Sequence, residues 1–207
     1  EDDVMPKMRL DKFLRDQGIA TRKELKEYIR KGLVRVNDAE VRDPGTHIDS
    51  DLDQVFVNGQ HIKYREFVYY MLNKPRGLIT ATEDSKAKTV LDLFPENIRR
   101  RKVFPVGRLD KDTEGLLIIT DNGLFAHNLL SPKKQVMKLY EAQLDKYPGD
   151  DAIETFAKGV VLDDGYKSLP AKLEFVSKQN KIIARVEIFE GKFHQVKRMF
   201  KVVGANV

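Results

Sequence analysis

The sequence predicts an α+β protein in which a small N-terminal domain of two helices and short strands precedes a larger domain built on a mixed sheet. The first observation is the irregular alternation of helical segments with more numerous strand-like ones, at 67–72, 103–106, 116–119, 136–144, 169–176 and 182–189. The second is the apolar run Leu116–Ile119, bounded by Gly115 and Asp121, which is typical of a strand buried on both faces. The third is that strands dominate and helices do not alternate regularly with them, which argues against a doubly wound fold. The sequence also shows no internal repeat and no dinucleotide fingerprint.

Helical segments are expected between and after these strands. They cover 89–94, 122–130, 151–156 and 194–203, with Asp121 capping the second and Asp150 or Asp151 beginning the third. Gln179 and Asn180 form the expected turn between the last two strands.

The composition sets limits on the class of protein. With 207 residues, 41% apolar and 33% charged, the chain can bury a core in one or two domains and is not disordered. No apolar run approaches the roughly 18 residues of a membrane-spanning helix, and Glu1–Met5 lacks a signal-peptide pattern. The absence of cysteine excludes disulfides, and the four histidines show no metal-ligand spacing. We therefore expect a cytoplasmic protein with no membrane partner and no metal.

The net charge of +5 is concentrated at the front of the chain. From Lys7 to Arg35 there are ten Lys or Arg residues against four Asp or Glu. Apolar residues recur at helical spacing here, and Thr21 and Glu24 form a capping box at the start of a second helix. Charge alone leaves two readings open, which are a pair of helices with solvated basic faces and a cationic surface for a polyanion.

The order of four segments favours a cationic surface for a polyanion. They are Met-Arg-Leu-Asp-Lys-Phe-Leu (8–14), Gly-Ile-Ala-Thr-Arg-Lys-Glu (18–24), Ile-Arg-Lys-Gly-Leu-Val-Arg-Val-Asn (29–37) and Asp-Pro-Gly (43–45). Residues 8–62 resemble a small RNA-binding domain named after a small-subunit ribosomal protein, so we expect a domain at 8–63 and a second one at 67–207. The resemblance implies that six cations lie near RNA phosphates: Arg9, Arg22, Lys23, Lys26, Arg30 and Lys31.

The stretch from Gly107 to Asn122 places Asp110 on a loop before the central apolar run. Three readings compete for this loop. It is a solvated hairpin tip, since Asp, Lys and Glu are ordinary turn residues. It is a calcium loop, with Asp110, Asp112, Glu114, Gly115 and Asp121 at the required spacing, although that pattern needs a helix on each side. Or it carries an aspartate nucleophile.

Three separated motifs favour the nucleophile. They are residues 107–115 (Gly-Arg-Leu-Asp-Lys-Asp-Thr-Glu-Gly), Lys138-Leu139-Tyr140, and residues 190–199 (Glu-Gly-Lys-Phe-His-Gln-Val-Lys-Arg-Met). Together they resemble the bacterial ribosomal-RNA pseudouridine synthases of the RsuA-like branch. The sequence of residues 194–200 (His-Gln-Val-Lys-Arg-Met-Phe) is most similar to that of members that act on small-subunit rRNA. Members of this family continue past the last helix with strands that complete the sheet, so further strands are expected beyond Val207.

The resemblance implies a reaction and a set of roles. The bond between uracil and ribose is cut, and the base turns and is reattached through its carbon 5, so no cofactor is required. Asp110 is the implied nucleophile, attacking either the ribose or the uracil ring. Tyr140 stacks on the target base near the proton that leaves carbon 5. Lys197 supplies the cation that keeps the partly buried Asp110 ionised.

Access to a stacked uridine requires base flipping, which costs a few kcal/mol and would be offset by charge contacts with RNA. We expect such contacts at Lys74, Arg76, Arg108 and Arg198, whereas the run Arg99–Lys102 is either a solvated loop or a further contact with the RNA backbone. The expected partner is ribosomal RNA or a pre-ribosomal particle, bound by a monomer. The alternative is a non-catalytic RNA-binding or ribosome-assembly factor that retains the fold.

Overall fold

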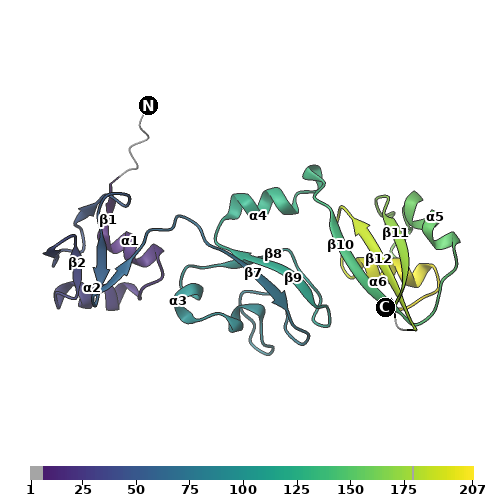
Figure 1. The fold of residues 1–207 in the computed structure, drawn as a ribbon, viewed down its shortest axis with the longest axis horizontal. Helices are drawn as coiled ribbons and strands as arrows, with labels where there is room; N and C mark the ends of the chain where they lie inside the picture. The colour runs from purple at the N-terminus through teal and green to yellow at the C-terminus, as the bar shows by residue number, and fades with distance from the viewer. Residues whose placement is uncertain (1–6, 179) are drawn as a thin grey trace. The chain divides into compact units, whose positions relative to one another are not determined.

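The computed structural model describes residues 7–178 and 180–207, so the expectations for Glu1–Met5 and for Gln179 lie outside the described residues. The chain forms two compact units that divide between Ala126 and His127, inside the predicted second domain. Figure 1 shows that both units contain helices and strands, which confirms the α+β class. The named strands pair antiparallel, not in the mixed sheet that was expected, and the parallel pairing among the described residues is the isolated bridge between Ile79 and Thr89.

The N-terminal part of the first unit has its own core. It contains β1 (Met8–Arg9), α1 (Leu10–Asp16), α2 (Arg22–Arg30), β2 (Val34–Val36), β3 (Ala39–Glu40), β4 (His47–Ile48), β5 (Val55–Val57) and β6 (Gln60–Ile62). The strands form a sheet of order β3-β2-β5-β6 and a separate β1-β4 pair. The capping box is confirmed, because Thr21 Oγ1 accepts from the Glu24 N–H and the Glu24 carboxylate accepts from the Thr21 N–H. The apolar faces of both helices pack on β2 and β5 through Phe13, Leu25 and Val34.

The rest of the first unit is a three-stranded sheet with short helices. It comprises β7 (Tyr69–Lys74), η1 (Val90–Leu93), α3 (Glu96–Arg99), β8 (Phe104–Val106), β9 (Gly115–Thr120) and α4 (Gly123–Leu130), which runs across the division between the units. The sheet order is β7-β9-β8. Leu117 and Ile119 of β9 are buried, whereas Leu116 is 65% exposed. The strand is therefore buried on one face only, and the expectation of two buried faces is wrong because the core of this part lies on the Leu117 side.

Two expectations for polar residues in this unit are also wrong. Arg101 belongs to the basic run, yet its side chain is only 6% exposed. Its guanidinium donates to Asp121, to Gln17 of the N-terminal domain and to the carbonyls of Arg65 and Glu66, so it ties the two parts of the unit together. Asp121 does not cap α4, since its carboxylate accepts from Arg101 and from the Val68 N–H, and the Asn122 side chain accepts from the Phe125 N–H instead.

The second unit is a three-stranded sheet covered by two helices. Its elements are η2 (Pro132–Lys134), β10 (Lys138–Leu144), α5 (Asp151–Lys158), β11 (Lys172–Lys178), β12 (Lys181–Ile188) and α6 (Gln195–Val202), with sheet order β10-β12-β11. Phe156 of α5 and Phe200 of α6 meet in the core, with their ring centroids 5.1 Å apart. Over residues 7–178 and 180–207, none of the helices is apolar over a length that could span a bilayer.

Candidate active site

Asp110 lies on the loop that joins β8 to β9. The two strands pair up to Val106 and Ile118, and the loop between them begins at Gly107 and ends at Gly115. Both glycines have positive φ, 85° and 127°, which a residue with a side chain rarely adopts, and this explains the glycine at each end of the motif. Asp110 itself is half-buried.

The calcium reading of this loop is wrong. Its flanking elements are strands, where the calcium pattern requires helices. The carboxylate of Asp121, which would be the last ligand, already accepts from Arg101 and from a backbone amide. Among the residues that the structure describes, no three His, Cys, Asp or Glu side chains gather as metal ligands would.

A buried lysine lies beneath the loop. Lys74 is fully buried, and its ammonium donates to the carbonyls of Asp110 at 3.0 Å, Lys111 at 3.3 Å, Thr113 at 2.8 Å and Pro75 at 3.1 Å. Burial lowers the pKa of Lys74, and the nearby carboxylates of Asp112, Asp110 and Glu114 oppose that shift. The predicted contact of Lys74 with RNA is therefore wrong, because its ammonium faces carbonyls inside the protein and presents no surface to a phosphate.

Further bonds hold the backbone of the loop. The hydroxyl of buried Thr80 donates to the Leu109 carbonyl at 2.7 Å and accepts from the Leu109 N–H at 3.1 Å. The Gly77 N–H donates to the Lys111 carbonyl at 2.8 Å. Sequence reasoning missed these supports, since the bonds join positions 29 or more residues apart and no local pattern announces them.

The cations around the loop are exposed. The Arg76 side chain is 72% exposed, and the carboxylate of Glu114 lies 3.8 Å from it. Arg108, which is next but one to Asp110, is also exposed. Both side chains are accessible to a polyanion.

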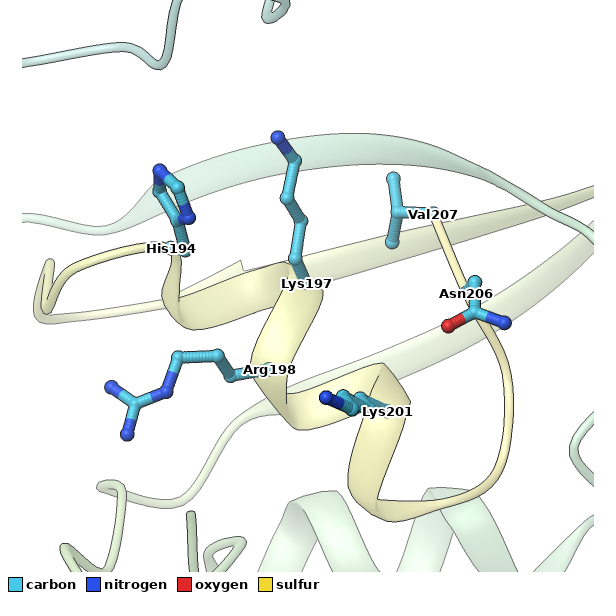
Figure 2. Close-up of a pocket in the computed structure, with 6 residues that line it drawn as sticks. All are labelled: His194, Lys197, Arg198, Lys201, Asn206 and Val207. Carbon is cyan, nitrogen blue, oxygen red and sulfur yellow. The ribbon is translucent and has the colours of Figure 1, made fainter. Parts of the chain in front are cut away.

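Tyr140 and Lys197 belong to the second unit, whereas Asp110 belongs to the first. Tyr140 lies on β10 opposite Val186 of β12, is half-buried, and packs against the core of its unit. Lys197 lies on α6 and lines a cavity of about 240 Å³ together with His194, Arg198, Lys201, Asn206 and Val207. Figure 2 shows His194 and Lys197 extending from one side of α6, while Arg198 leaves the helix in another direction.

Buried polar groups support the start of α6. The Glu190 carboxylate, 7% exposed, accepts from the Tyr166 hydroxyl at 2.5 Å, from the Leu169 N–H at 2.8 Å and from the Gln195 amide at 2.7 Å. The Gln195 side chain also accepts from the Lys192 N–H at 2.8 Å. Glu190 and Gln195 of the motif therefore support the start of α6 together with Tyr166 and Leu169. The hydrogen bond to Glu190 raises the pKa of Tyr166.

Arg198 is held by two carboxylates. Its guanidinium donates to Asp163 and lies 2.6 Å from Asp164, and its side chain is 18% exposed. The hydrogen bond from Arg198 lowers the pKa of Asp164. These ion pairs attach α6 to the segment between α5 and β11, where Asp163 and Asp164 lie. Contact of Arg198 with RNA stays a prediction.

The six cations predicted to face RNA in the N-terminal domain are exposed: Arg9, Arg22, Lys23, Lys26, Arg30 and Lys31. Two of them have acidic neighbours, since Arg9 lies 2.9 Å from Asp11 and Lys31 lies 2.6 Å from Glu27. Such exposed pairs are weak and exchange readily for phosphate contacts. The N-terminal helices therefore offer a cationic surface to which a polyanion such as RNA can bind.

Comparison with known proteins identifies the family. The RNA pseudouridylate synthase family matches residues 68–201, and the S4 domain matches residues 8–53. The chain belongs to the RNA pseudouridylate synthase family, and it is therefore an isomerase with an N-terminal S4 domain. The predicted family and the predicted RNA-binding domain are both confirmed.

Individual relatives agree with this assignment. An uncharacterized RNA pseudouridine synthase of Bacillus subtilis is 45% identical, over 97% of this chain and 84% of the relative. Ribosomal large subunit pseudouridine synthase B of the same organism is 38% identical, over 96% and 82%. Ribosomal small subunit pseudouridine synthase A of Vibrio cholerae is 38% identical, over 97% and 85%. A crystal structure of a pseudouridylate synthase matches 97% of this chain and 85% of its own, with 31% identity and a TM-score of 0.63.

Proposed function

We propose that this protein converts a uridine of small-subunit ribosomal RNA to pseudouridine, with Asp110 as the nucleophile. The proposal rests on the Asp110 loop, which lies in the segment that matches the family. Lys74 and Thr80, from outside the loop, hold its backbone. A side chain that must reach a single atom of its substrate needs a backbone that does not move.

The choice of small-subunit RNA rests on the motif at residues 194–200 (His-Gln-Val-Lys-Arg-Met-Phe). The large-subunit relative of Bacillus subtilis and the small-subunit relative of Vibrio cholerae are both 38% identical to this chain. Overall similarity therefore does not separate the two substrates, and the motif is what favours the small subunit.

The proposed chemistry assigns one role to each of three residues. Asp110 attacks the flipped nucleotide, at the anomeric carbon of the ribose or on the uracil ring, and a covalent bond to the carboxylate replaces the bond that breaks or the ring double bond. Tyr140 stacks on the extruded uracil, and its hydroxyl lies near the proton that leaves carbon 5 after reattachment. The uracil loses this proton and gains one at nitrogen 1, so the reaction has no net proton change. Lys197 supplies the positive charge that stabilises the ionised Asp110.

RNA is held by cations on both sides of the S4 boundary, all of them exposed except Arg198, whose side chain is 18% exposed and paired with Asp163 and Asp164. The proposed phosphate contacts are Arg9, Arg22, Lys23, Lys26, Arg30, Lys31, Arg76, Arg108 and Arg198. These contacts offset the few kcal/mol that unstacking the uridine costs. We further propose that the protein acts in the cytoplasm as a monomer on ribosomal RNA or a pre-ribosomal particle, with residues 8–63 and 67–207 as its domains.

Mapping pseudouridines in ribosomal RNA from cells that lack the protein tests this proposal. The expected result is the loss of one modification from small-subunit RNA, restored by the wild-type gene and not by Asp110→Asn. A modification lost from large-subunit RNA would show that the substrate is assigned wrongly. Unchanged modification in both subunits would favour an assembly factor that binds RNA without converting it.

The role of Tyr140 has its own test. Tyr140→Phe keeps the ring and removes the hydroxyl, so RNA binding is expected to persist while turnover is lost. Full activity in this variant, measured on the RNA from the deletion strain, would refute a role in proton transfer.

A further inference from the structure

The two peptide groups on either side of the Asp110 α-carbon are each held by a buried side chain. On the N-terminal side, the Leu109 carbonyl accepts from the Thr80 hydroxyl at 2.7 Å. On the C-terminal side, the Asp110 carbonyl accepts from the Lys74 ammonium at 3.0 Å. Because each peptide group is planar, fixing both of them fixes the φ and ψ of Asp110. The direction of its carboxylate then depends only on its own side-chain torsions.

Thr80 holds Leu109 at two atoms. Its hydroxyl donates to the Leu109 carbonyl and also accepts from the Leu109 N–H at 3.1 Å. The pair of bonds fixes both the position and the tilt of this residue, which a single bond would not do. Lys74, by contrast, donates to carbonyls only, and two of them, those of Lys111 and Thr113, follow Asp110.

Thr80 is itself anchored in the core. It is 4% exposed, and a β-branched side chain has few rotamers to choose from. The preceding residue, Ile79, donates its N–H to the Lys88 carbonyl and accepts from the Val90 N–H, and Val90 is fully buried. A continuous path of backbone and hydroxyl bonds therefore runs from the core to the residue before Asp110.

We propose that Thr80 is a positioning residue for the reaction, which sets the direction of the Asp110 carboxylate and contacts no substrate itself. The inference rests on the proposed role of Asp110 as nucleophile. Removing the hydroxyl would let Leu109 and the Asp110 carboxylate move, which lowers the chemical rate and leaves the cationic RNA-binding surface intact. A small displacement of a reacting group is enough to slow a reaction by about 100-fold.

The test compares three variants. Thr80→Val removes both hydrogen bonds at nearly constant volume, and Thr80→Ser restores the hydroxyl. Thr120→Val is a matched control, because Thr120 is also buried and makes the same two kinds of bond, donating to the Val68 carbonyl at 2.6 Å and accepting from the Asn122 N–H at 3.1 Å. Thr120 lies at the end of β9 opposite to Gly115, where the loop ends.

Each protein is assayed under single-turnover conditions on ribosomal RNA from cells that lack the gene, and its dissociation constant for that RNA is measured separately. Thr80→Val is expected to lose about 10- to 100-fold in rate with RNA affinity unchanged. Thr80→Ser and Thr120→Val are expected to stay within about threefold of the wild-type rate. Equal rates for the two valine variants, or a serine variant as slow as the valine one, would overturn the inference.

Amide hydrogen exchange gives a second measurement that needs no destabilised variant. In the wild type and in Thr80→Ser, the Leu109 N–H is expected to be protected, and exchange at the rate of an exposed loop would contradict the inference. Asp110→Asn distinguishes a failure of the proposed function from a failure of the positioning role of Thr80. Retained turnover in that variant would refute the proposed function, whereas its inactivity together with a fully active Thr80→Val would refute only the positioning role.

Discussion

The Asp110 loop of the first unit and the segment from Glu190 to Arg198 of the second both rest on buried polar groups, but the source of those groups differs. The loop is held by Lys74 and Thr80, which lie 29 or more residues away in the sequence. The segment supplies Glu190 and Gln195 from its own residues, and Glu190 also accepts from Tyr166 and Leu169, which lie 24 and 21 residues away. The buried groups that hold the loop thus lie outside it, whereas the buried carboxylate and amide at the start of α6 belong to the segment itself and are joined by Tyr166 and Leu169.

The two supports also differ in charge. A buried cation with four carbonyl partners supports the loop, so its removal leaves several polar groups unsatisfied at once. The segment rests on a carboxylate that accepts from a tyrosine, an amide side chain and a backbone N–H, and these bonds can be removed one at a time. Perturbing the loop should therefore cost more stability than perturbing the segment.

The largest effect is expected for Lys74→Met. Methionine fills a similar volume without a donor, so the carbonyls of Asp110, Lys111 and Thr113 lose their partner. The free energy of unfolding should fall by about 3 kcal/mol or more, as measured by urea denaturation. Lys111→Met, an exposed change on the same loop, is the control and should be nearly neutral. If both variants were equally stable, the ammonium would not hold the loop.

A smaller effect is expected for Glu190→Gln. The amide keeps the shape of the side chain but brings an N–H group toward donors that the carboxylate accepted from. Urea denaturation should show a loss of about 2 kcal/mol, less than for Lys74→Met. Tyr166→Phe removes only one of these bonds and should cost about 1 kcal/mol. A Glu190→Gln protein less stable than Lys74→Met would reverse the ranking of the two regions.

The smallest effect concerns the acidic partners of Arg198. Because the hydrogen bond from Arg198 lowers the pKa of Asp164 in the folded state, the pair stabilises the protein above the ordinary aspartate pKa of 3.8. That stabilisation is lost as the pH falls through the lowered value. Asp164→Asn should therefore melt slightly below the wild type at pH 7, and the difference should shrink in strongly acidic buffer. The exposed Asp38→Asn is the control, and a difference that grows with acid would contradict the ion pair.

Local patterns predicted much of the fold. The capping box of Thr21 and Glu24 depends on residues three positions apart, and it is present in the structure. The position of the Asp110 loop could likewise be predicted, because Gly107 and Gly115 stand where the backbone has positive φ.

What the sequence did not reveal are contacts between distant residues. In the sequence, Lys74 and Arg101 each look like surface cations in a polar stretch. In the structure both are buried, with carbonyls around Lys74 and carbonyls and the Asp121 carboxylate around Arg101, and most of these partners are distant in the sequence. Leu116 misled for a related reason: an unbroken apolar run does not show which face of its strand has a core beneath it. Thr80 carries no signal at all, because its hydroxyl bonds to a residue 29 positions away.

The most direct test of the account is a count of pseudouridines formed per RNA molecule by Asp110→Asn and by Asp112→Asn, two carboxylates of the same loop. The account predicts that Asp110→Asn binds the RNA as tightly as the wild type and forms no pseudouridine, while Asp112→Asn stays active. Pseudouridine formation by Asp110→Asn at the rate of Asp112→Asn would contradict it.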